Sequence, residues 1–159
     1  MSQGRVYTVS FTGVAVTAQV DLFELTPADD KPIEVLGLEV GQSSDFGDAQ
    51  AEQIGFRVIR GFTTSGSGGT ATTPTPMTKN SDTAAGFAAE TCNTTLATTG
   101  TTADVHAGVM NMQAGYPIWL PEGCEWGCSQ ADTRLVIRII AAPADSLTLS
   151  GTAYVREQG

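Results

Sequence analysis

The feature that most constrains the fold is an alternation of apolar and polar residues with a period of two. It begins with Tyr7, Val9 and Phe11, which are separated by threonine and serine. After Gly13 the apolar residues move to even-numbered positions and continue through 14–22. Successive side chains of a β-strand point to opposite faces of a sheet, so this pattern predicts strands. The change of parity predicts a bulge or tight bend at Gly13.

Six more segments carry strand patterns between turn-forming residues, namely 33–42, 52–62, 83–96, 103–113, 132–142 and 146–156. With the two segments at the start, they make about eight strands. The intervals hold no helical pattern except a short turn near 48–53, and parallel strands would need long crossovers. The sequence therefore predicts an all-β fold, an antiparallel β-sandwich or barrel with jelly-roll topology, as a single domain over residues 1–159.

The apolar positions of these strands predict which side chains form the core. The expected inward residues are Phe11, Val16, Val20, Leu36, Leu38, Ile54, Phe56, Val58, Leu135, Ile137, Ile139, Leu147, Leu149 and Val155. Opposing sheets that each bury one such face account for a core sufficient for one domain.

Residues 63–77 interrupt the strand pattern with a run of Gly, Ser, Thr and Pro. Such a run buries little apolar surface, so it predicts a long exposed loop. As a linker between two domains it would leave too few strands on each side, and we favour a loop within one domain. Residues 1–5 form a short N-terminal arm, and both segments are candidates for contacts with a neighbouring chain.

The charge of the chain argues against several partners. Eight basic and seventeen acidic residues give a net charge of −9, which would repel the phosphates of a nucleic acid. The apolar run in 135–144 is too short and too interrupted to span a membrane. The N-terminus lacks the apolar core of a signal peptide, so we expect synthesis in a cytoplasm.

The candidates for catalysis and metal binding are few. The chain has a single histidine, His106, whereas cupin-type metal sites use two or three. No Gly-x-Ser-x-Gly motif accompanies it, which argues against a catalytic triad. Cys124 and Cys128 could pair, or could bind zinc with Cys92 and His106, but unpaired thiols are the favoured interpretation.

Acidic loop residues at 29–30 and at 45 and 48 do not match the spacing of a calcium-binding loop. They leave calcium binding open and do not predict it. From all these residues we expect no enzymatic activity and no cofactor.

The remaining chemistry lies on surfaces. In 134–142 the face opposite the predicted core carries Val136 and Ile140 between Arg134 and Arg138, an unusual covering for the sheet of a monomer. A turn rich in aromatic residues carries Tyr116, Trp119 and Trp126, residue types that anchor interfaces. These seven residues are the candidate interface, and they predict a homo-oligomer, with a trimer favoured; the alternative is that the aromatic residues cap the core of one subunit.

Four stretches resemble uncharacterised proteins of tailed bacteriophages and prophages: PIEVLGLEVGQSSD (32–45), EQIGFRVIRG (52–61), WLPEG (119–123) and LVIRIIAAPAD (135–145). The resemblance spans most of the chain and implies a small β-sandwich or jelly-roll component of the virion. The role it implies is a decoration or cement protein that binds the major capsid protein on the outside of the head. The chain is longer than the best-known small decoration proteins. The alternative is a tail- or fibre-associated module that recognises a receptor or glycan.

Overall fold

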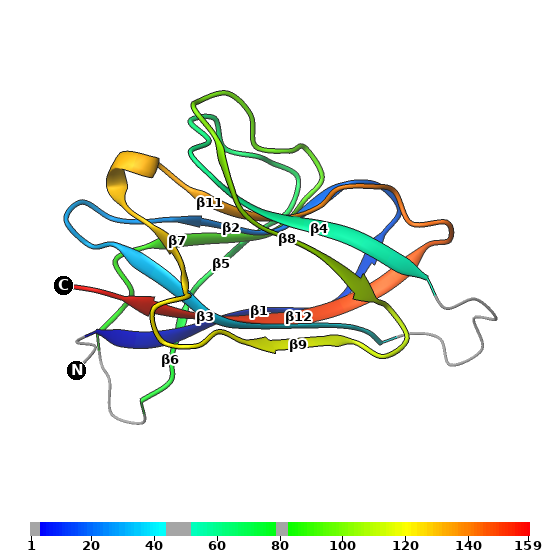
Figure 1. Cartoon of the computed structure of the whole chain (residues 1–159), viewed down its shortest axis with the longest axis horizontal. Helices are drawn as coiled ribbons and strands as arrows, with labels where there is room; N and C mark the ends of the chain where they lie inside the picture. The colour runs from blue at the N-terminus through cyan, green and yellow to red at the C-terminus, as the bar shows by residue number, and fades with distance from the viewer. Residues whose placement is uncertain (1–3, 44–51, 79–82) are drawn as a thin grey trace.

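The computed structural model describes residues 4–43, 52–78 and 83–159, and in these residues two antiparallel sheets pack face to face (Figure 1). The first sheet contains β10 (Trp126–Cys128), β3 (Ile33–Gln42), β12 (Leu147–Glu157), β1 (Arg5–Val16) and β6 (Thr75–Pro76), with β9 (Tyr116–Trp119) also paired to β3. The second sheet contains β5 (Thr70–Thr72), β7 (Ala88–Asn93), β2 (Val20–Thr26), β11 (Leu135–Ile139), β4 (Gln53–Arg60) and β8 (Ala103–Asn111). The fold class is thus the predicted one, but the described residues form twelve strands, not about eight.

The order of the strands is that of a jelly roll. In the first sheet β1, β12, β3 and β9 are neighbours, and in the second sheet β2, β11, β4 and β8 are neighbours. The chain crosses from sheet to sheet at the β1–β2, β2–β3, β3–β4, β5–β6, β6–β7, β8–β9, β10–β11 and β11–β12 connections, and the first and last strands pair with each other. This arrangement confirms the predicted topology. The other four strands extend the sheets at their edges.

Gly13 is the bulge that the change of parity predicted. The register between β1 and β12 shifts between Phe11 and Val14, and Gly13 lies in the left-handed region with φ 64°. A residue without a Cβ adopts this conformation at little cost. Tyr7, Val9 and Phe11 therefore point inward before the bulge, and Val16 does so after it.

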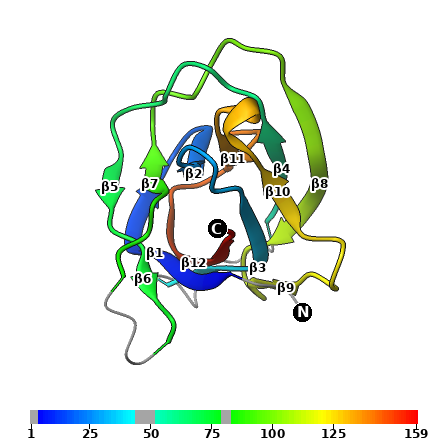
Figure 2. The same cartoon turned by 90° about the vertical axis from the view of Figure 1, so that its left-hand side faces the viewer.

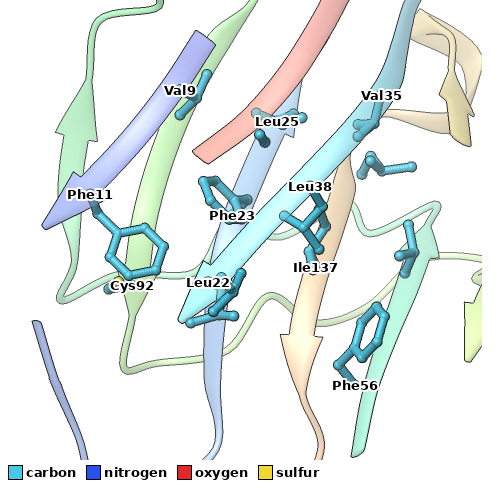
Figure 3. Packing of buried hydrophobic residues seen from close by; sticks show 14 of the residues in the cluster. Val9, Phe11, Leu22, Phe23, Leu25, Val35, Leu38, Phe56, Cys92 and Ile137 are labelled. Atoms are coloured by element: carbon cyan, nitrogen blue, oxygen red, sulfur yellow. The ribbon is translucent and has the colours of Figure 1, made fainter. Parts of the chain in front are cut away.

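The core fills the space between the two sheets, where Phe11, Phe23, Leu38, Ile137 and Phe56 converge (Figure 3). Every predicted inward residue is buried except Leu36, which is half-buried. The prediction for Leu36 is wrong because the pairing of β3 with β12 shifts register between Tyr154 and Val155, which leaves Leu36 without a partner on β12.

Residues 63–77 are mostly exposed, as predicted, but they are not a free arm. They contain β5 and β6, which pair with β7 and β1 of the same chain. Of the N-terminal arm, Arg5 already belongs to β1, and residues 1–3 lie outside the described residues. Residues 48–51 of the predicted turn and the acidic residues 45 and 48 also fall outside them, whereas Glu52 precedes β4 and Gln53 begins it.

The only helical element in the described part of the chain is a short 3₁₀ turn, Gln130–Asp132. No helix there is long and apolar enough to cross a membrane.

Candidate binding surfaces

Two uncharged segments, 61–69 and 94–102, lie together over the outer face of the second sheet and are called the threonine cover here. They rise above β11 and β4 in Figures 1 and 2. Their backbones form a short ladder, in which the amides of Thr64 and Thr98 donate to each other's carbonyl oxygens at 3.0 and 3.1 Å. Ser67 and Thr95 exchange the same pair of bonds at 2.9 Å. The two segments of the cover are therefore joined by β-type backbone hydrogen bonds.

A small apolar cluster lies between the cover and the sheet. It consists of Ile59, Phe62, Ala97 and Val136, all buried. Val136 faces away from the main core, as the strand pattern predicted, but its exposed fraction is 0%. The expectation that Val136 is exposed on a bare sheet is wrong because Phe62 and Ala97 of the cover pack on it.

An ion pair anchors the second segment of the cover. Asp21 of β2 has no exposed surface, and the Arg138 guanidinium donates to it from Nε at 2.5 Å and from Nη2 at 3.1 Å. The Ala97 amide donates to the same carboxylate at 2.8 Å, and Arg138 donates to the Ala97 carbonyl oxygen at 2.8 Å. Arg138 also lies 4.7 Å from the centroid of the Phe62 ring. Arg138 therefore holds the cover and is not a free surface residue.

A second ion pair anchors the first segment. The Nε of Arg134 lies 3.1 Å from Oε1 of Glu24, which is buried in β2. The same carboxylate accepts hydrogen bonds from the Ser65 hydroxyl at 2.6 Å and the Gly66 amide at 2.9 Å. Asn93 donates to it at 3.0 Å. The buried carboxylates of Asp21 and Glu24 are thus both paired with an arginine and hydrogen-bonded, which is the condition under which burial is tolerated.

Sequence reasoning missed Asp21 and Glu24. A signal was present, since two carboxylates interrupt the otherwise apolar segment that becomes β2, and two arginines occupy the same face of 134–142. Acidic residues inside a strand that is buried on both sides require cationic partners. We had assigned those arginines to an open surface.

The outer face of the first sheet is exposed at Ser10, Glu39 and Trp119 and carries a second candidate surface. In one row across the sheet, Trp119 of β9 and Tyr154 of β12 both pair with Gly37 of β3, which lies between them. Their ring centroids are 4.5 Å apart. A Cβ on Gly37 would lie 2.7 Å from Cε3 of Trp119, so the ring packs where only glycine leaves room. Trp119 remains 59% exposed, so it lies at the surface and does not cap the core; its role in an interface stays a prediction.

The next row of the same face is polar. Pro117, Glu39, Thr152 and Ser10 follow one another across β9, β3, β12 and β1. The Ser10 and Thr152 hydroxyls are 2.9 Å apart, and the Tyr154 hydroxyl donates to Glu39 at 3.3 Å. Burial raises the pKa of Tyr154 above its ordinary value, and the Glu39 charge and hydrogen bond add to this effect.

A shallow hollow of about 390 Å³ opens over the polar row, beside the aromatic row. Ser10, Glu39, Pro117 and Thr152 line it together with Gly41, Gly115 and Ser150. In the third row Gly41 pairs with Ser150. Because these residues have no side chain or a small one, the backbone is accessible there.

The other candidate interface residues are less exposed than expected. Trp126 is 3% exposed, and its ring lies 5.0 Å from His106, so it caps the core of its own chain. Tyr116 is half-buried and meets Phe56 edge-on at 5.1 Å. Ile140 is half-buried beside Gly55. Of the seven residues, only Trp119 is a large exposed apolar side chain.

The candidates for chemistry stay apart. No group of three or more His, Cys, Asp or Glu residues that could hold a metal ion occurs among the described residues. His106 lies between the rings of Phe56 and Trp126. Cys92, Cys124 and Cys128 are all free thiols, and burial raises the pKa of Cys92 and of Cys128 to about 12.

Comparison with known proteins adds no relative: no family model matches the sequence, and neither a curated protein nor a solved structure matches it. What the structure defines is a two-sheet antiparallel β-sandwich with one covered and one open outer face.

Proposed function

We propose that the protein is a non-enzymatic virion component that binds the outside of a phage head and stabilises it through protein–protein contacts. The partner is the major capsid protein. The resemblance of four sequence stretches to phage proteins supports this role, and the observation that carries the docking argument is the rigid, uncharged threonine cover.

The cover differs in charge from the chain as a whole. The net charge is −9, yet neither segment of the cover contains a charged side chain. Charged residues are depleted from the centres of protein interfaces, because their desolvation is costly. An acidic protein that docks through the cover keeps its repulsive charges in water.

The cover is also held in place before any partner binds. The two buried ion pairs and the backbone ladder fix both segments, so docking orders little additional chain. Ordering of loops and side chains is one of the main costs of association, and a preformed surface lowers it. The sequence predicted that the exposed loop 63–77 would contact a neighbouring chain. In the proposal, part of that loop instead contributes to a preformed docking surface.

The role requires neither a cofactor nor a nucleic acid, and its place is the virion after synthesis in the host cytoplasm. A homo-oligomer, with a trimer favoured, stays a prediction. Its basis is narrower than the sequence indicated, because Val136 is covered within its own chain and Ile140 is half-buried. Sedimentation of the purified protein tests it, and Ile140→Asp is expected to weaken assembly without unfolding the chain.

The docking test adds purified protein to expanded heads that lack it and measures binding and the temperature at which heads disrupt. We expect saturable binding and a raised disruption temperature. Thr98→Glu places a charge on the exposed cover and is expected to weaken binding, whereas Thr12→Glu, an equal change at an exposed position of β1, is not. Equal binding by both variants would contradict docking through the cover.

The second candidate function is a tail- or fibre-associated module that recognises a receptor or glycan. The exposed Trp119, whose ring packs at a tilt against Tyr154, favours it, because aromatic faces beside polar groups are a common basis of recognition. Binding to tails or cells, with none to heads, would select this candidate.

A further inference from the structure

We propose that the hollow beside Trp119 on the outer face of the first sheet is a binding site for an uncharged saccharide. This inference deepens the second candidate function and does not depend on docking to a head. The threonine cover and this face lie on opposite sides of the sandwich (Figures 1 and 2), so both surfaces can be occupied at once.

The aromatic row supplies the apolar part of the site. A pyranose ring has one or both faces formed by C–H bonds, and such a face packs on the flat surface of an aromatic ring. Trp119 is 59% exposed. Its indole ring contacts Tyr154 and packs over Gly37, where the lack of a side chain leaves room for it, and these contacts hold the ring in place. The ring is therefore a preformed platform that binds without being ordered first.

The polar row supplies hydrogen-bonding groups in the row next to Trp119. Glu39 lies in the row next to Trp119 and accepts, while the Ser10 and Thr152 hydroxyls both donate and accept. Saccharide hydroxyls need this mixture of donors and acceptors around an apolar face. The hollow of about 390 Å³ falls within the roughly 300–1,000 Å³ of small-ligand sites.

Charge selects among saccharides. Glu39 lines the hollow, and the chain carries a net charge of −9, so an acidic sugar meets repulsion at the site and from the whole protein. The cation nearest in the sheet order, Arg156, is engaged by Glu34 at 3.1 Å and by Glu125 at 3.7 Å. These charges exclude acidic sugars, and the proposal is confined to neutral ones.

The test uses the two tryptophans of the chain. Trp126→Phe leaves Trp119 as the single tryptophan, so its fluorescence reports the site alone. The probes are neutral trisaccharides of glucose, mannose, galactose and N-acetylglucosamine at millimolar concentration, and lactose is compared with sialyllactose to isolate the effect of charge. We expect saturable fluorescence changes with at least one neutral probe and weaker binding of sialyllactose than of lactose.

Isothermal titration calorimetry, which needs no fluorescence signal, then measures binding of the same probes to the wild-type chain and to its variants. Trp119→Ala is expected to weaken the selected probe by about tenfold or more, as for the central aromatic residue of an interface. Glu39→Gln is expected to weaken it less, and Thr98→Glu on the cover is expected to leave it unchanged. Absence of binding by every neutral probe overturns the proposal, as does undiminished binding by Trp119→Ala. Loss of head binding in Trp119→Ala, with no saccharide bound, would instead assign this face to protein docking.

Discussion

Arg138→Met tests whether the buried ion pairs hold the threonine cover in place. Methionine keeps most of the volume of the arginine stem but removes the three hydrogen bonds that Arg138 donates to Asp21 and Ala97. Asp21, which has no exposed surface, would retain only the Ala97 amide as a partner. Removing one partner of a buried pair costs about 3–5 kcal/mol, because the other charge is left uncompensated.

The expected loss is large enough to measure by thermal unfolding followed by circular dichroism. At about 2–4 °C per kcal/mol for a domain of this size, Tm should fall by about 6–20 °C. Hydrogen exchange should show reduced protection of the amides in 94–102. Asp21→Asn combined with Arg138→Met should recover most of the loss, since the asparagine oxygen still accepts from Ala97 and no charge remains buried.

A matched control lies on the same face of the second sheet. Arg57 forms an ion pair with Asp104 at 3.2 Å, but both side chains are about half exposed. Arg57→Met should therefore cost at most about 1 kcal/mol. If Arg138→Met is no more costly than Arg57→Met, or if the double variant is no better than the single one, the ion pair does not anchor the cover.

Three further predictions concern particular residues. Maleimide at pH 8 should label one thiol of the native chain, the exposed Cys124. Burial raises the pKa of Cys92 and Cys128 to about 12 and keeps these thiols protonated and inaccessible. Rapid labelling of all three thiols would contradict this prediction. Gly37→Ala in the Trp126→Phe background should shift the emission of Trp119, since the new Cβ would lie 2.7 Å from its ring, and an unchanged spectrum would refute the packing. Gly100→Ala should lower Tm, because Gly100 has φ 94° and its Cβ would lie 2.1 Å from the Gly61 oxygen; an unchanged Tm would mean that the two segments of the cover do not cross there.

The strands and the main core were predictable because the period of two is a local property of the sequence. It placed β3 at its observed bounds and located the bulge at Gly13. The short strands β9 and β10 escaped prediction, since each has at most four residues and contains proline or glycine. Pairing with β3 determines their conformation, and pairing is not visible in a local pattern.

The outer faces were harder to predict, for a tertiary reason. The alternation correctly put Val136 on the face opposite the core, but it could not show that Phe62 and Ala97, far away in the chain, would cover it. Composition assigned 63–77 to a loop, which hid the backbone pairing of Thr64 with Thr98 and of Ser67 with Thr95. The aromatic pair was half predicted: Trp119 was identified, but Tyr154 was not, because only the register of β12 with β3 brings the two rings together.

The most direct test of the account is a hydrogen-exchange footprint of the protein bound to heads, compared with the free protein. Docking through the threonine cover predicts added protection in 61–69 and 94–102 and none in β9 or around Tyr154. Added protection confined to the Trp119 face, or no stable binding to heads, would contradict the central claim.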